Sequence, residues 1–227
     1  QERFLGAFAY SADEYLSTLP LPSEVSVAVM VNAKDLIHYS GGMERGVDLL
    51  FNPCEQSPVN IVRIATHAKD VKECEALAHK IGSLGYRVFL NLMQVDSLQS
   101  AELEEIAGLV ANWNTIEVLY FADSFGNLEP GSVARIVASI SSVWGLPIGI
   151  HAHDNKGQAL LNTLTALDCG VSYLDSTVLG MGRGAGNTKT ENLLVEMSLR
   201  DGYQYSPEAL FPIVLHEFQL LQTRFGW

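Results

Sequence analysis

Six apolar, β-branched runs recur along the chain, and their starts lie about 25 to 34 residues apart. The runs occupy residues 25–31, 59–66, 86–92, 115–122, 146–153 and 171–178. A longer stretch separates each run from the next, which is enough chain for one strand and one returning helix. This alternation predicts consecutive parallel β/α units.

The intervening stretches carry apolar residues at helical spacing. They predict helices over residues 70–82, 100–110, 130–140, 158–167 and 190–199, and a final one over 207–223. Ser100 is placed as an N-cap. The final helix would carry Leu210, Val214, Phe218 and Leu221 on one face.

Repeated β/α units allow either an open doubly wound sheet or a barrel. No Gly-x-Gly-x-x-Gly follows the first run, and no Gly-Lys-Ser loop occurs. Polar residues instead gather where the runs end, which is where (β/α)₈ barrels build their sites. These residues are His67, Asn91, Asp123, Ser124, His151, His153, Asp154 and Asn155. The pattern therefore favours a barrel, although eight strands would require two more units than the chain contains.

The chain is acidic, with a formal charge of -12. Such a charge argues against nucleic acid or an anionic membrane as partner, and no apolar run is long enough to span a membrane. Cys54, Cys74 and Cys169 form neither a metal-type pair nor a disulfide framework. Idle thiols of this kind are typical of a cytoplasmic protein.

His151 and His153 are the strongest chemical feature. Residues two apart in a strand point to the same side, so both imidazoles would face the barrel mouth, with Gly149 beneath them. Two neutral imidazoles one strand step apart suit half of a divalent-metal site. The alternative is a pair of structural or substrate-binding histidines.

A glycine-rich loop, residues 179–187, follows the last run and ends in Asn187. Its glycines permit positive φ and close backbone approach. It could be a flexible connection or a phosphate-binding loop. Asn187 offers an amide oxygen to a hard cation, but an Asn after Gly is more often a turn or cap residue.

Four segments together resemble the DRE-TIM metallolyase (HMGL-like) superfamily, which includes 4-hydroxy-2-oxovalerate aldolases, hydroxymethylglutaryl-CoA lyases and isopropylmalate synthases. They are YFADSFG at 120–126, HAHDNKGQALLNTLTAL at 151–167, LGMGRGAGN at 179–187 and VRIATH at 62–67. The last segment resembles the hydroxy-oxovalerate aldolases in particular.

This resemblance implies a (β/α)₈ barrel with Mn²⁺ or Mg²⁺ at its C-terminal mouth. The metal ligands of the family would fall on His151, His153 and Asn187. The family's remaining protein ligand is an Asp in an Arg-Asp-Gly segment on the first strand. The only such segment here, at 200–202, follows the last barrel helix, so the role is not transferred to it.

The resemblance places the first run on the third strand of the family barrel. Residues 1–200 would then be an incomplete catalytic barrel, from the third to the eighth strand, and 201–227 a C-terminal helical extension. Residues 6–19 would be the tail of the second unit. We therefore expect about fifty more residues upstream, because a six-stranded remnant would expose an apolar edge.

The implied enzyme is an oxo-acid lyase that cleaves a 4-hydroxy-2-oxo acid to pyruvate and an aldehyde through a metal-stabilised enolate. Its base and Arg would lie upstream, so no catalytic residue is assigned. Ser124 and Asn91 are predicted to contact substrate.

The partners would be the 2-oxo acid and a second copy or a dehydrogenase. The alternatives are a Claisen-type acyl-CoA synthase or lyase, and a non-catalytic barrel subunit. The C-terminal helix could form an interface, although covering the barrel base is its plainer role.

Overall fold

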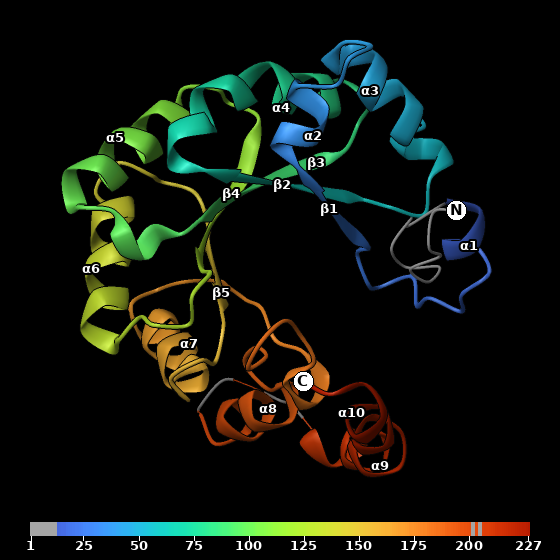
Figure 1. Cartoon of the computed structure of the whole chain (residues 1–227), viewed down its shortest axis with the longest axis vertical. Helices are drawn as coiled ribbons and strands as arrows, with labels where there is room; N and C mark the ends of the chain where they lie inside the picture. Colours follow the sequence, from blue (N-terminus) through green and yellow to red (C-terminus); the bar gives the residue numbers. More distant parts are fainter. Residues whose placement is uncertain (1–12, 201–202, 204–205) are drawn as a thin grey trace. The chain divides into compact units, whose positions relative to one another are not determined.

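The computed structural model describes residues 13–200, 203 and 206–227. Six strands form one sheet in chain order (Figure 1). They are β1 (Ala28–Asn32), β2 (Ile61–His67), β3 (Arg87–Met93), β4 (Ile116–Asp123), β5 (Ile148–Ala152) and β6 (Tyr173–Leu174). The pairs β1–β2, β4–β5 and β5–β6 are parallel. The predicted α/β fold of six consecutive β/α units is confirmed.

Helices connect the strands. The longer ones are α3 (Met43–Leu50), α4 (Cys74–Ser83), α5 (Ser100–Ala111), α6 (Pro130–Ser141), α7 (Ala159–Asp168) and α8 (Thr190–Ser198). The shorter ones are α1 (Asp13–Leu16), α2 (Ala33–Ile37), α9 (Phe211–Ile213) and α10 (Gln219–Phe225). Every predicted helix from 70 to 199 has its counterpart, and a 3₁₀ turn over Ala68–Glu73 opens the first of them.

Two helices follow β1 that the sequence patterns did not predict. The side chain of Asn32 caps α2 by accepting a hydrogen bond of 3.1 Å from the Lys34 amide. Helix α3 buries only Gly46 and Val47 of its eight residues. Helix α2 has five residues and α3 has eight, so both are shorter than the window of about 11 to 18 residues in which a helical period is recognised.

Three local predictions need correction. Ser100 lies inside α5 and not at its N-cap, and the carboxylate of Glu102 accepts the Gln99 amide at 2.8 Å instead. The run at 171–178 forms only a two-residue strand, because Thr177 bridges to Lys189 and Val178 opens a 3₁₀ turn. The predicted tail helix at 6–19 is seen only as α1, since residues 6–12 lie outside the described residues.

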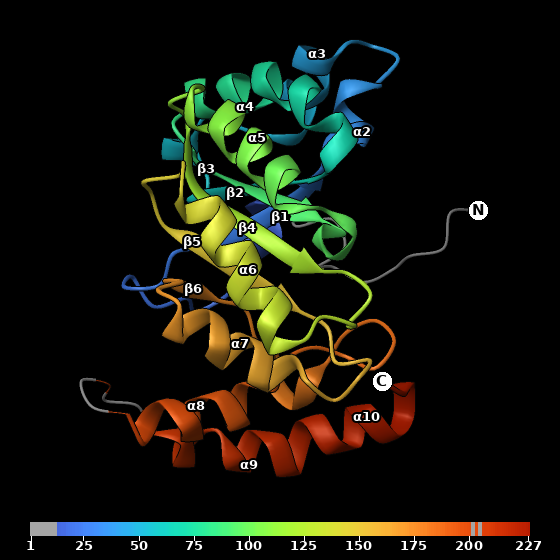
Figure 2. The same ribbon diagram turned by 90° about the vertical axis from the view of Figure 1, so that its left-hand side faces the viewer.

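The C-terminal helix is also more broken than predicted. A 3₁₀ turn (Pro207–Ala209), α9, a π-helical turn (Val214–Phe218) and α10 replace a single helix. Only Val214 of the four predicted face residues is buried. The segment contacts α8 and the turn after β6, and Figure 2 shows α9 and α10 alongside α8.

The chain divides into two compact units. Unit 1 comprises residues 1–91 with 109–118, and unit 2 comprises 92–108 with 119–227. The core of unit 1 includes Ile64, Leu77 and Leu90, which are fully buried. In unit 2, helices α6 and α7 pack together and α7 packs on β5, which buries Phe121 and Ile150 completely. Strands buried on both faces read as continuous apolar runs, as observed for β4.

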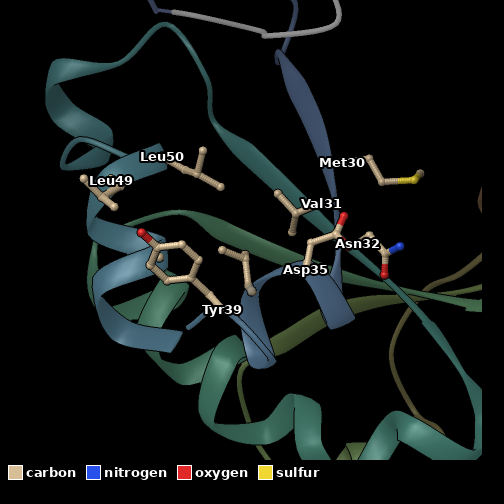
Figure 3. Close-up of a pocket in the computed structure, with 9 residues that line it drawn as sticks. Met30, Val31, Asn32, Asp35, Tyr39, Leu49 and Leu50 are labelled. Atoms are coloured by element: carbon tan, nitrogen blue, oxygen red, sulfur yellow. The ribbon is translucent and has the colours of Figure 1, made fainter. Parts of the chain in front are cut away.

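Unit 1 has an apolar pocket of about 350 Å³ beside β1, the edge strand of the described sheet (Figure 3). Met30, Leu49 and Leu50 line it and remain more than half exposed. These three side chains give the described part of unit 1 an exposed apolar surface beside β1.

Candidate metal and substrate site

Strand β5 and the residue after it carry the two histidines of the predicted site. His151 lies in β5, and His153 follows the strand in an isolated antiparallel bridge to Asn187. The centroids of the two imidazole rings lie 5.1 Å apart. The alternation of side chains in the strand thus brings both rings to one place, as the sequence predicted.

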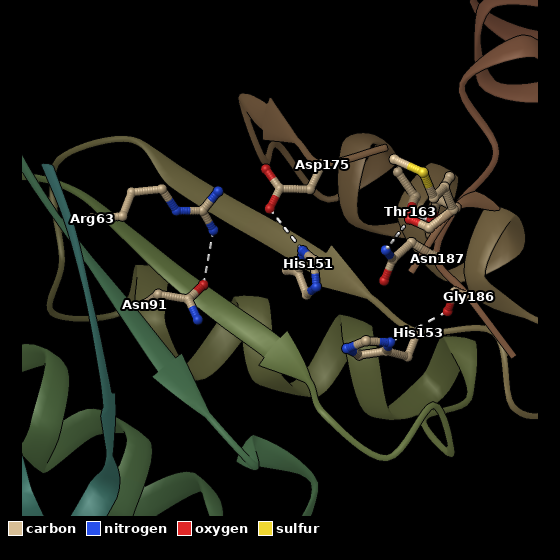
Figure 4. A network of polar contacts seen from close by, with 10 residues as sticks. Arg63, Asn91, His151, His153, Thr163, Asp175, Gly186 and Asn187 are labelled. Atoms are coloured by element: carbon tan, nitrogen blue, oxygen red, sulfur yellow. Dashed lines mark hydrogen bonds and ion pairs between the residues drawn. The ribbon is translucent and has the colours of Figure 1, made fainter. Parts of the chain in front are cut away.

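Hydrogen bonds fix the orientation of both rings (Figure 4). Nδ1 of His151 lies 2.8 Å from a carboxylate oxygen of Asp175, and Nδ1 of His153 lies 3.3 Å from the carbonyl oxygen of Gly186. Because both oxygens act as acceptors, we assign the ring proton to Nδ1 in each case. Each Nε2 then carries a lone pair, which is the arrangement found behind metal-binding histidines.

The protonation of His153 favours the same chemistry. Burial is the main cause that lowers its pKa, and the neighbouring His151 and Arg183 act in the same direction. The hydrogen bond to Gly186 opposes them. A neutral imidazole is the form that binds a metal ion.

Asn187 ends the glycine-rich loop. Its side-chain nitrogen donates to the carbonyl of Met181 at 3.2 Å, and its backbone nitrogen donates to the carbonyl of Gly180 at 3.0 Å. Its Oδ1 is buried and accepts no hydrogen bond from any residue that the structure describes. Figure 4 shows this amide beside the two imidazoles. A buried carbonyl oxygen without a donor suits a cation.

Aromatic rings lie one strand step below His151. Gly149 is in register with Tyr120 on β4 and Tyr173 on β6, and those two rings pack edge to face at 6.2 Å. A Cβ at residue 149 would overlap the ring of Tyr120. The glycine in front of the His-x-His pair is therefore required by the ring beside it.

Ser124 follows β4 and is half-buried. Its hydroxyl oxygen accepts the Gln94 amide at 3.0 Å, and its carbonyl accepts a guanidinium hydrogen bond from Arg183 at 3.0 Å. In the bond with Gln94 the hydroxyl acts only as acceptor, so its own O–H can donate to a ligand. Arg183 of the glycine-rich loop is a contact that the sequence did not single out.

Asn91 and Arg63 form a polar pair in unit 1. The side chain of Arg63, on β2, donates to Oδ1 of Asn91, on β3, at 2.9 Å. Asn91 is nearly fully buried, so this bond satisfies an amide oxygen that would otherwise be costly to bury. Arg63 is a charged residue in the middle of an apolar run. This exception to the run could have indicated a buried polar contact, but the sequence analysis did not select it.

Carboxylates that accept backbone amides organise the turns around the site. Asp123 is completely buried and accepts the amides of Asn127 and Leu128, both at 3.1 Å. Burial raises its pKa despite these bonds. Asp154 accepts the first amide of α7, from Ala159, at 2.8 Å. Asp154 therefore caps α7. Asp175, which the sequence analysis did not select, follows β6 and could have been selected because polar residues at strand ends form the site of such barrels.

The donor set fits part of a metal site. Among the described residues, no three His, Cys, Asp or Glu side chains are grouped to hold a metal ion. Two imidazole nitrogens and one amide oxygen are available, and a further ligand would complete the set. In the Arg-Asp-Gly segment, Arg200 is a cation and pairs with Asp168 at the surface. Asp201 and Gly202 lie outside the described residues.

Comparisons with known proteins agree on one family. The model of the HMGL-like family matches residues 45–217. A 4-hydroxy-2-oxovalerate aldolase from Pelotomaculum thermopropionicum is 34% identical over 149 residues, which cover 66% of this chain and 43% of that protein. One from Burkholderia thailandensis is 28% identical over 180 residues, which cover 79% and 51%. The chain thus spans about half the length of these curated relatives.

Solved structures share the fold. The N-terminal domain of a putative aldolase from Bacteroides vulgatus has a TM-score of 0.81 at 27% identity and covers all of this chain and 73% of that one. The HMG-CoA lyase of Bacillus subtilis has a TM-score of 0.73 at 16% identity over 92% of this chain and 73% of that one, a likeness of fold alone. With more than half of its residues matched by one family model, this chain belongs to the HMGL-like family.

Proposed function

We propose that this chain forms the catalytic part of a divalent-metal-dependent aldolase, which cleaves a 4-hydroxy-2-oxo acid to pyruvate and an aldehyde. The observation that supports it best is the grouping of His151, His153 and Asn187, with both Nδ1 atoms backed by oxygens and the Asn187 oxygen buried. The names of the relatives support the reaction class.

His151, His153 and Asn187 would hold Mn²⁺ or Mg²⁺. A bound divalent cation would supply Lewis-acid stabilisation of the negative charge that develops on the keto oxygen of the substrate as the C–C bond breaks. Asp175 would keep the His151 ring in the tautomer whose Nε2 faces the cation. The base that removes the proton of the 4-hydroxyl is expected outside this chain.

Ser124 and Asn91 are proposed to bind substrate. The Ser124 hydroxyl can donate, because its oxygen already accepts the Gln94 amide. Asn91 can donate through its Nδ2, because its Oδ1 already accepts Arg63. A neutral donor of this kind stabilises an oxygen atom of an oxo acid without itself changing charge.

The remaining inferences concern the whole protein. We propose residues 1–200 as an incomplete barrel and 201–227 as its helical extension, with a further β/α segment pairing against the exposed edge of β1. Phe211, Leu220 and Phe225 are exposed on the C-terminal segment and would pack against a second copy.

The three cysteines are free, which supports a cytoplasmic location. In the part of the chain that is described, no helix could cross a membrane.

The experiment measures pyruvate release over a panel of 4-hydroxy-2-oxo acids, coupled to a dehydrogenase. In the full-length protein, we expect Mn²⁺-dependent turnover that EDTA removes, and loss of bound Mn²⁺ and of turnover in His151→Ala. His216→Ala, which removes an exposed histidine of the same unit, is the matched control and should keep both.

Two outcomes would contradict the proposal. Thiol release from an acyl-CoA and a 2-oxo acid, with no pyruvate release, would favour a Claisen-type synthase. Silence in both assays, with equal metal content in wild type and His151→Ala, would favour a non-catalytic subunit.

A further inference from the structure

Leu179 adopts a backbone conformation that a leucine rarely takes. Its φ of 53° and ψ of 24° lie in the left-handed region. Gly180, Gly184 and Gly186 of the same loop also have positive φ, but a glycine has no Cβ to clash there. For an L-residue with a side chain this conformation costs about 1–2 kcal/mol. Something in the surrounding structure must therefore hold it.

Two side chains from outside the loop hold both polar groups of Leu179. Its amide donates to a carboxylate oxygen of Glu191, on α8, at 3.0 Å. Its carbonyl accepts the indole N–H of Trp227, at the C-terminal segment, at 3.0 Å. Glu191 is only 6% exposed, so its bond to Leu179 is shielded from water.

The backbone next to Leu179 in turn orients Asn187. The carbonyl of Gly180 accepts the Asn187 amide, and the carbonyl of Met181 accepts the Asn187 side-chain nitrogen. If Leu179 relaxed to negative φ, both carbonyls would turn, and the Asn187 oxygen would lose its fixed direction. The loop thus transmits the geometry of Leu179 to a proposed metal ligand.

We propose that Glu191 and Trp227 are positioning residues that hold Leu179 in its left-handed conformation and thereby aim Oδ1 of Asn187 at a bound divalent cation. This inference rests on the proposed function. It assigns the C-terminal segment a role at the site, since Trp227 closes the loop from outside. Neither residue needs to touch the cation or the substrate.

The test measures the dissociation constant of Mn²⁺ alone by titration calorimetry. We expect Trp227→Phe to weaken binding about fivefold, the effect of losing one hydrogen bond. Leu179→Gly removes the strain, so adding Trp227→Phe to it should change the constant less than twofold. Trp144→Phe is the matched control, because it removes an indole bond of 3.0 Å to Pro147 in the same unit and should leave Mn²⁺ binding unchanged.

Amide hydrogen exchange supplies a readout that does not require the metal. The Leu179 amide should exchange faster in Glu191→Gln and in Trp227→Phe than in wild type or Trp144→Phe. Equal exchange in all four proteins would overturn the clamp. The link between the strain at Leu179 and the direction of Asn187 would be overturned if Trp227→Phe bound Mn²⁺ as tightly as wild type. It would also be overturned if Trp227→Phe weakened Mn²⁺ binding equally with leucine and with glycine at position 179.

Failure of the proposed function has a separate signature. Wild type and His151→Ala would then bind Mn²⁺ equally, and the aiming of Asn187 would be overturned with it. The hydrogen-exchange comparison would still decide whether Glu191 and Trp227 hold Leu179.

Discussion

Strand β5 and the glycine-rich loop at 179–187 both supply donors to the candidate site, but they position them differently. His151 is held by strand pairing with Ala122 on β4 and by the side chain of Asp175. Asn187 is held by backbone turns, and the neighbouring Leu179 is held in turn by the side chains of Glu191 and Trp227. The strand therefore provides rigidity through its own geometry, whereas the loop depends on its tertiary neighbours.

The largest effect should come from the strand. Gly149→Val would push a side chain into the ring of Tyr120, and overpacking of this kind should lower the free energy of unfolding by about 3 kcal/mol. Chemical denaturation measures the change. Gly131→Ala, in α6 where a Cβ meets nothing within 4 Å, should lose no stability. Equal stability of the two variants would show that β5 is not closely packed there.

The loop should respond differently to its own glycine substitution. Gly186 has a positive φ of 86°, and a Cβ added there would overlap the carbonyl oxygen of Gly180. We therefore expect Gly186→Ala to lower the free energy of unfolding by about 2 kcal/mol and to weaken Mn²⁺ binding. Gly184→Ala is the matched control. Its φ of 66° is also strained, but its nearest neighbour lies 3.8 Å away. Equal Mn²⁺ affinity in both variants would show that the backbone contact at 186 does not shape the site.

A buried hydroxyl pair ties the end of the loop to α7. Thr163 and Thr188 share a hydrogen bond of 2.8 Å. Thr163→Val leaves the Thr188 hydroxyl buried without its partner and should lower the free energy of unfolding by about 1.5 kcal/mol. The double variant with Thr188→Val should lie closer to wild type. Thr165→Val, on the exposed side of α7, should change little. Additive losses in the double variant would contradict the pairing.

Asp123, at the end of β4, gives a pH-dependent comparison. Its pKa is raised by burial, so between its ordinary value of 3.8 and its folded value the folded state binds more protons than the unfolded state. Stability from this group is therefore present at low pH and lost as pH rises through that window. As the pH rises through this window, the free energy of unfolding of wild type should fall relative to that of Asp123→Asn. Chemical denaturation at several pH values measures the difference. A difference that grows in favour of wild type would mean that the amide bonds outweigh burial.

The smallest effect belongs to the surface. Lys156 and Glu129 form an ion pair of 3.1 Å, but both side chains are largely exposed. Lys156→Ala should change the free energy of unfolding by about 0.3 kcal/mol at low salt, and by less in 1 M NaCl. A large loss at either salt concentration would show that the turn after β5 depends on this pair.

The sequence alone determined the β/α order, all six strands, the helices between residues 70 and 199, and the grouping of His151 with His153. It could do so because parallel strands bury both faces and side chains alternate every two residues, so that local spacing carries the geometry. Helices α2 and α3 were not predicted because each is shorter than the window in which a helical period is recognised.

Only the tertiary structure decided the partners of these residues. It paired His151 with Asp175, Asn91 with Arg63, and Leu179 with Glu191 and Trp227. These contacts join positions 24 to 48 residues apart, except for the bond of Leu179 to Glu191, 12 residues on. No local period encodes such contacts, because hydrogen bonds between distant segments depend on how the strands and helices pack.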